Sequence, residues 1–202
     1  IKAGQRPPFP LVAHAHAVLM GSFLLLLFAQ TMLMATGRCQ QHQKVGIAAF
    51  VLAPLLVIVG FILAPTNYHL VWHAAQVAPP EARAALAQRI PVLDDILLLQ
   101  LRIGVLFPLF LVLGLTARKH DAGLHKRMML IAPAMALPAA FDRITWYPSS
   151  LPVSPCSTSL YPLLALAPMF LWDVIRNGRV HRAYWLMMAF YVPAALLVDL
   201  AW

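Results

Sequence analysis

Charge is scarce in this sequence: only 11% of its 202 residues are Asp, Glu, Lys or Arg. Soluble domains carry about 25%. Apolar residues make up 61% of the chain, and the mean hydropathy is +0.76. This composition excludes an ordinary water-soluble enzyme and indicates a protein that resides in a lipid bilayer.

Cysteine is nearly absent as well, and the two present, Cys39 and Cys156, are too few for a disulfide framework. The sequence lacks a Cys-x2-Cys-His motif for covalent haem, and His69 is not followed by the Glu of a His-Glu-x2-His zinc protease. No Ser is placed with a His and an acid so as to predict serine chemistry. The sequence therefore offers no motif that assigns a reaction.

Long apolar stretches dominate what is present. Six of them have about the 17–25 residues that cross a bilayer: 11–36, 45–64, 96–117, 128–146, 159–175 and 183–202. They predict an all-α fold, a single polytopic membrane helical bundle of six transmembrane helices covering residues 1–202. The outer gap 65–91 is long, and we expect it to form two short interfacial helices split by Pro79 and Pro80.

Basic residues collect in alternate gaps between these stretches. Nine of the 15 Lys and Arg lie in three gaps: Arg38, Lys44, Arg118, Lys119, Lys126, Arg127, Arg176, Arg179 and Arg182. The positive-inside rule makes these gaps cytoplasmic, which with six spans places both termini outside. Each gap also carries a His before the next span, namely His42, His125 and His181. This similarity suggests three related helical hairpins or, alternatively, convergent use of interfacial anchors.

Ionisable residues inside membrane spans are costly and usually mark function. Counting from the midpoint of each span places most of them in the outer half of the bundle. The candidate metal ligands are His14, His16, His69, His73, Asp94, Asp95 and Asp142, with Arg102 balancing their charge. Imidazoles and carboxylates at one level of the membrane are the donors of a metal centre, or of axial haem ligation. For any single histidine, an interfacial hydrogen-bonded side chain is the alternative.

Arg102 is the cation that this counting places deepest in the membrane. An unpaired guanidinium near the bilayer centre costs about 2.5–3.5 kcal/mol, so it needs a partner at similar depth. Asp142 in the next span is the nearest carboxylate in depth. We therefore expect an ion pair or a short water-bridged contact between Arg102 and Asp142.

One set of residues carries a family resemblance: His14-Ala15-His16, Gln30, Gly37-Arg38, His42-x3-Gly46 and Leu124-His125-Lys126-Arg127-Met128-Met129-Leu130. This set resembles bacterial inner-membrane proteins with His-Arg-x2-Gly and His-Lys-Arg-Leu-Met-Leu motifs, a family without an assigned reaction. The resemblance implies the inner membrane of a bacterium.

The segment His42-x3-Gly46 is also similar to the His-x3-Gly at helix starts in cytochrome b561-type proteins. There the His ligates haem and the Gly allows close approach. That resemblance implies a haem on the inner side, held by His42 and His125.

We interpret the chain as an integral membrane protein that binds haem b or a transition-metal ion (Fe, Cu or Zn). Its expected role is membrane electron transfer or oxidative chemistry. Two alternatives stay open: a non-catalytic accessory subunit of a larger membrane complex, and a metal-dependent membrane lipid hydrolase. The expected partners are membrane lipids, with quinone or other membrane protein subunits, and no nucleic acid.

The orientation is tested by the two cysteines, which lie in gaps assigned to opposite sides. We expect a membrane-impermeant thiol reagent to label Cys156 in intact cells and Cys39 only after lysis. Labelling of Cys39 from outside would overturn the orientation.

Overall fold

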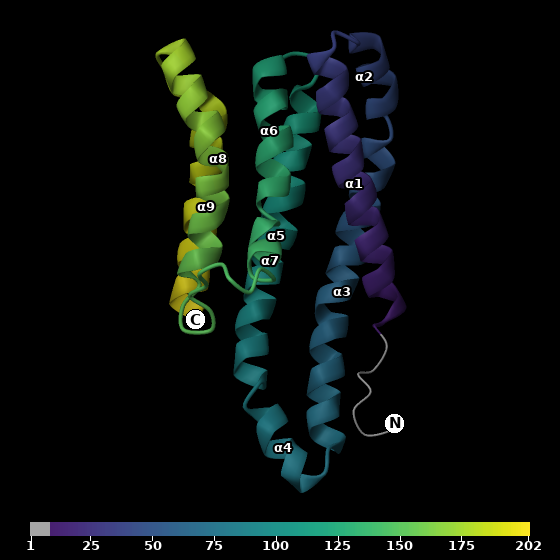
Figure 1. Ribbon diagram of the computed structural model, residues 1–202, viewed down its shortest axis with the longest axis vertical. Coiled ribbons are helices and arrows are strands. Elements are labelled where there is room, and N and C mark those ends of the chain that lie inside the picture. The colour runs from purple at the N-terminus through teal and green to yellow at the C-terminus, as the bar shows by residue number, and fades with distance from the viewer. Residues whose placement is uncertain (1–8) are drawn as a thin grey trace. The chain divides into compact units, whose positions relative to one another are not determined.

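The computed structural model describes residues 9–202, and within them every regular element is a helix (Figure 1). The helices are α1 (Leu11–Ala35), α2 (Cys39–Gly46), α3 (Ala49–Val77), α4 (Pro80–Ala87), α5 (Ile90–Ala117), α6 (Ala122–Ala134), α7 (Leu137–Phe141), α8 (Cys156–Asn177) and α9 (Arg182–Ala201). The all-α prediction is confirmed.

Among the described residues, five helical segments are long and apolar enough to cross a membrane. They are Leu11–Ala35, Ala49–Val77, Pro80–Ala117, Cys156–Asn177 and Arg182–Ala201. No more than a third of the residues in the apolar window of each segment are buried, as expected of helices that face lipid tails on much of their surface. The chain is therefore a multi-pass helical membrane protein.

The expected span 128–146 is divided into α6 and α7. Pro133 and Pro138 each lack a backbone N–H, so two helical hydrogen bonds are missing within five residues. Between them the backbone tightens, with Met135 N–H donating to Ala132 O (3.1 Å) and Ala136 N–H donating to Pro133 O (3.0 Å). The 13 residues of α6 are too few to cross a bilayer alone.

The outer segment 65–91 differs in part from its expectation. Helix α3 continues through Pro65 to Val77, so the first of the two expected short helices is absent. A single proline removes one N–H, which a membrane helix tolerates. The helix breaks at Ala78-Pro79, and α4 starts at Pro80. Arg83 donates to Ala78 O (3.3 Å), the carbonyl just after the end of α3. The second expected helix is α4.

The chain divides into two compact units, Ile1–Leu70 and Val71–Trp202, which are described separately. In the first unit, α1 ends in a Schellman motif. Gly37 takes a positive φ of 74°, Gly37 N–H donates to Met34 O (3.2 Å) and Arg38 N–H donates to Leu33 O (2.8 Å). This turn places Arg38 directly against the last turns of α1, ahead of the polar helix α2.

In the second unit, α5 and α6 pack together as an antiparallel pair, and α8 and α9 form another (Figure 1). Phe110, Met128 and Ile131 are fully enclosed in this core. The two helices approach closely at Gly114, where an added Cβ would lie 3.0 Å from the Cβ of Met128. Gly114 therefore sets the distance between the two helices.

Substituting Gly114→Ala should lower the melting temperature of the detergent-purified protein, because overpacking a core typically costs about 1–3 kcal/mol. Gly21→Ala is the matched control, since nothing lies within 4 Å of a Cβ at that position. Scanning fluorimetry of both variants checks this. Equal melting temperatures for the two variants would contradict the close approach.

Candidate functional site

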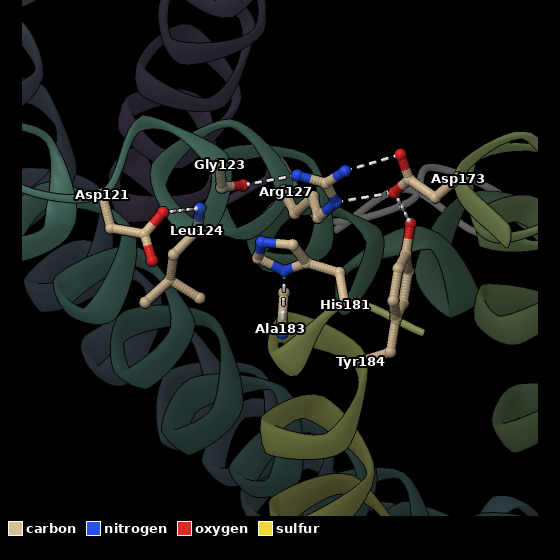
Figure 2. A network of polar contacts seen from close by, with 8 residues as sticks. All are labelled: Asp121, Gly123, Leu124, Arg127, Asp173, His181, Ala183 and Tyr184. Atoms are coloured by element: carbon tan, nitrogen blue, oxygen red, sulfur yellow. Dashed lines mark hydrogen bonds and ion pairs between the residues drawn. The ribbon is translucent and has the colours of Figure 1, made fainter. Parts of the chain in front are cut away.

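A network of buried polar groups joins α6, α8 and α9 at the end of the second unit that carries the basic gaps (Figure 2). Arg127 donates from Nε to one oxygen of Asp173 and from a terminal nitrogen to the other, both at 2.6 Å. Its remaining terminal nitrogen donates to Gly123 O (2.9 Å). The hydroxyl of Tyr184 donates to Asp173 Oδ2 (2.5 Å). Three helices are thereby tied through one carboxylate.

These three side chains are enclosed in spite of their polarity, since Arg127, Asp173 and Tyr184 are 9%, 8% and 4% exposed. A buried guanidinium and carboxylate are tolerated when they are paired and their other hydrogen-bonding groups are satisfied. Both conditions are met here. Arg127 donates to Asp173 and to Gly123 O, so the network holds the three helices together. We call it the clamp.

Two helix caps flank this clamp. Asp121 caps α6 by accepting from Leu124 N–H (2.8 Å), and it pairs with Arg182 at the start of α9. The Leu124 N–H, aided by Arg182, holds the pKa of the Asp121 carboxyl below its ordinary value. The Asp121 cap therefore keeps its charge at neutral pH.

His181 caps α9, with its Nδ1 accepting from Ala183 N–H (3.1 Å). An accepting Nδ1 puts the proton of the neutral ring on Nε2, which faces Gly123 (Figure 2). Burial, together with the charge of Arg127, lowers the pKa of the His181 imidazole. The ring therefore stays neutral at physiological pH, as its capping role requires.

Arg102 of α5 contacts the first turn of α8, at the opposite end of that helix from Asp173. Its partners differ from the expected one. It donates to Ser159 Oγ (2.8 Å), Thr158 O (3.2 Å) and Thr158 Oγ1 (3.3 Å). Its guanidinium lies 5.8 Å from the ring centroid of Tyr191, whose hydroxyl donates to Ser159 O (2.5 Å). Within residues 9–202 Arg102 forms no direct ion pair with Asp142, so the ion-pair form of the prediction is wrong. Asp142 instead accepts from Ser149 Oγ (3.3 Å).

The reason is depth. Thr158 and Ser159 belong to the first turn of α8, so Arg102 is level with the N-terminal end of that helix rather than with its middle. The first 12 residues of α5, about 18 Å, extend past this level (Figure 1). Near the headgroup region a cation needs no buried carboxylate, and hydroxyl and carbonyl oxygens are sufficient.

The outer metal-ligand candidates are spread over several helices. His14 and His16 lie in α1, His69 and His73 in α3, Asp94 and Asp95 in α5, and Asp142 at the end of α7. Most of these side chains are exposed. Within residues 9–202, no group of three or more His, Cys, Asp or Glu is placed to share a metal ion. The outer metal centre stays a prediction.

The inner candidates His42 and His125 share a geometry. Each lies in a basic gap, and each directs Nδ1 at a backbone carbonyl of the preceding membrane helix. For His125 the acceptor is Gly114 O at 2.8 Å, and for His42 it is Gln30 O at a longer 3.4 Å. An Nδ1–H that donates to a carbonyl leaves the lone pair on Nε2, which is the usual arrangement of a metal-binding histidine.

The surroundings of His42 include an unusual amide. The side-chain Nε2 and Oε1 of Gln30 are both buried, and neither has a hydrogen-bond partner among the described residues. Gly46, four residues after His42, lies against this amide, and an added Cβ there would be 3.6 Å from Gln30 Nε2. A buried amide without a hydrogen-bond partner costs free energy, so a polar group that binds next to it would be stabilised by the hydrogen bond it supplies.

Sequence reasoning missed Asp173 and assigned Arg127 only to topology. A signal was present, because Asp173 is an acid near the inner end of a predicted span, on the side where Arg127 begins another. Opposite charges at one membrane level are candidates for pairing.

No protein-family model, curated protein or solved structure matches this chain.

The clamp is tested by a double-mutant cycle on Arg127→Gln and Asp173→Asn. Each single variant should destabilise the protein by about 3–5 kcal/mol, because it leaves one buried polar partner uncompensated. The double variant should be more stable than the worse single variant. Thermal unfolding in detergent measures all four proteins, with exposed Arg179→Gln as the control. Strictly additive losses would show that the pair is not coupled.

Proposed function

We propose that this chain is an integral membrane protein that binds haem b or a transition-metal ion through imidazole and takes part in membrane electron transfer. His42 in the first unit and His125 in the second are each proposed as a ligand, and each is considered within its own unit. The observation that supports them is the hydrogen bond from each Nδ1 to a backbone carbonyl. Such a bond orients the ring and fixes the tautomer that a metal ligand needs.

The residues around His42 fit such a group. Gly46 has no side chain, and the buried amide of Gln30 that lies against it can donate to or accept from a polar edge of the group. When bound, haem or a copper or iron ion supplies one-electron chemistry. The protein's part is to hold the imidazoles and to exclude water with apolar helices.

We further propose six crossings of the inner membrane of a bacterium, with α6 and α7 together making the fourth. Their combined range, 122–141, is 20 residues or about 30 Å, which matches a bilayer. An even number of crossings and the positive-inside rule then put both termini outside. Membrane lipids, quinone and other membrane protein subunits are the proposed partners, and nucleic acid is not.

One observation favours a second candidate, a non-catalytic accessory subunit. The enclosed charged side chains Arg102, Arg127 and Asp173 all contact groups of the protein itself. Charged side chains that contact only other groups of the protein can hold helices together in a protein that catalyses no reaction. The lipid-hydrolase alternative needs several ligands around one ion, and no contact within residues 9–202 favours it.

An absorption spectrum of the detergent-purified protein, oxidised and reduced, together with metal analysis, separates these functions. We expect a Soret band or a stoichiometric transition metal. His125→Ala and His42→Ala should each lower the cofactor content several-fold, because each removes a donor nitrogen. His120→Ala, an exposed histidine beside the same basic gap, is the control.

Cofactor-free wild-type protein, or full retention in both variants, would sink the haem and metal proposal and favour the accessory subunit. Retention in those two variants combined with loss in His69→Ala/His73→Ala would move the site to the outer cluster. The stoichiometry of the wild-type protein also counts how many groups the chain binds.

A further inference from the structure

We propose that a groove between α1 and α2 is a binding site for one anionic phospholipid, with an acyl chain along the groove and the phosphate at Arg38. The groove is lined by Ala29, Met32, Leu33, Thr36, Arg38 and Val45. Its free volume is about 370 Å³. A water molecule occupies about 30 Å³, so the groove suits a chain rather than a single small ion. This proposal does not depend on the proposed function.

The groove lies where the hydrocarbon ends. Helix α1 is a 25-residue apolar helix, and the lining residues 29–36 are its last two turns and the residue that ends it. Helix α2 follows at once, with the polar sequence CQQHQKVG. Apolar walls therefore meet polar groups at one level, as tails and headgroup do in a lipid.

Arg38 is held at the mouth of the groove by the backbone. The Schellman motif at Gly37 turns the chain so that Arg38 follows directly on the end of α1, and its side chain is exposed. A guanidinium binds phosphate oxygens in a bidentate manner, and the neighbouring Lys44 adds a second positive charge in the same hairpin.

Charge complementarity selects an anionic occupant. Residues 1–70 contain no Asp and no Glu, although they include Arg38 and Lys44. By contrast, the ion pairs Arg127–Asp173 and Arg182–Asp121, both within residues 9–202, give the other basic gaps an acid of their own. The α1–α2 hairpin has no acid within its unit, and lipid phosphates are the abundant anions at the level of the headgroups.

Native mass spectrometry of the full chain in mild detergent tests this proposal. After exchange with phosphatidylglycerol or phosphatidylcholine of equal chain length, we expect one phosphatidylglycerol retained per chain, in preference to phosphatidylcholine. Arg38→Gln should reduce that preference about fivefold, whereas Arg38→Lys should keep much of it. Arg179→Gln, which changes an exposed Arg in another basic gap, should leave it unchanged.

A second variant tests the groove apart from the charge. Ala29→Phe fills the apolar wall and should reduce retention of both lipids while the protein stays monodisperse. Three outcomes would overturn the proposal: equal retention of the two lipids, a preference that Arg38→Gln does not change, or full displacement by glycerol 3-phosphate without acyl chains. Occupation of the groove by a second copy, seen as a dimer that Ala29→Phe dissociates, would also overturn it.

Discussion

Hydrocarbon offers no hydrogen bonds, and the second unit depends on how that constraint is met at Arg127. Its guanidinium donates to both oxygens of Asp173 and to Gly123 O, and Tyr184 completes the same carboxylate. Loss of one member would leave a bare polar group between helices that lipid cannot stabilise. The positions of α6, α8 and α9 at this end follow from that requirement, and so do the caps at Asp121 and His181.

The membrane helices could be predicted from the sequence because every backbone polar group in lipid must be satisfied within a helix, which makes length and apolarity sufficient signals. Pairings between helices could not, since they depend on rotation and axial shift. Arg102 illustrates the error. Its depth was counted from the middle of the apolar run 96–117, whereas α5 begins at Ile90 and passes the start of α8. The sequence identified His42 and His125 by resemblance, while the carbonyls they contact became visible only in three dimensions.

The hairpins that carry His42 and His125 correspond more closely than their sequences indicate. In each, the histidine contacts a carbonyl 11 or 12 residues earlier, at Gly114 and Gln30 respectively. In each, the residue four positions after the histidine packs against the residue that supplies that carbonyl. The sizes are exchanged: Gly46 meets the long side chain of Gln30, while Met129 lies over Gly114. The same two positions are therefore in contact in both hairpins, with the large residue on one helix in the first hairpin and on the other helix in the second. Related hairpins with different packing would show this exchange.

The extension of α5 past α8 also gives this protein an uneven hydrophobic edge. Residues 96–101 of α5 are largely apolar and lie before Arg102, so the apolar surface ends about 9 Å further out at α5 than at α8. Lipids at this end of the helices must therefore meet two thicknesses around one molecule. The exposed Trp146, in the loop before α8, has an amphipathic ring suited to the shallower side. A bilayer accommodates such mismatch by local thinning or by helix tilt, at a cost that grows with each ångström. The tilt of α5 relative to α8 and α9 should therefore depend on the acyl-chain length of the surrounding lipids.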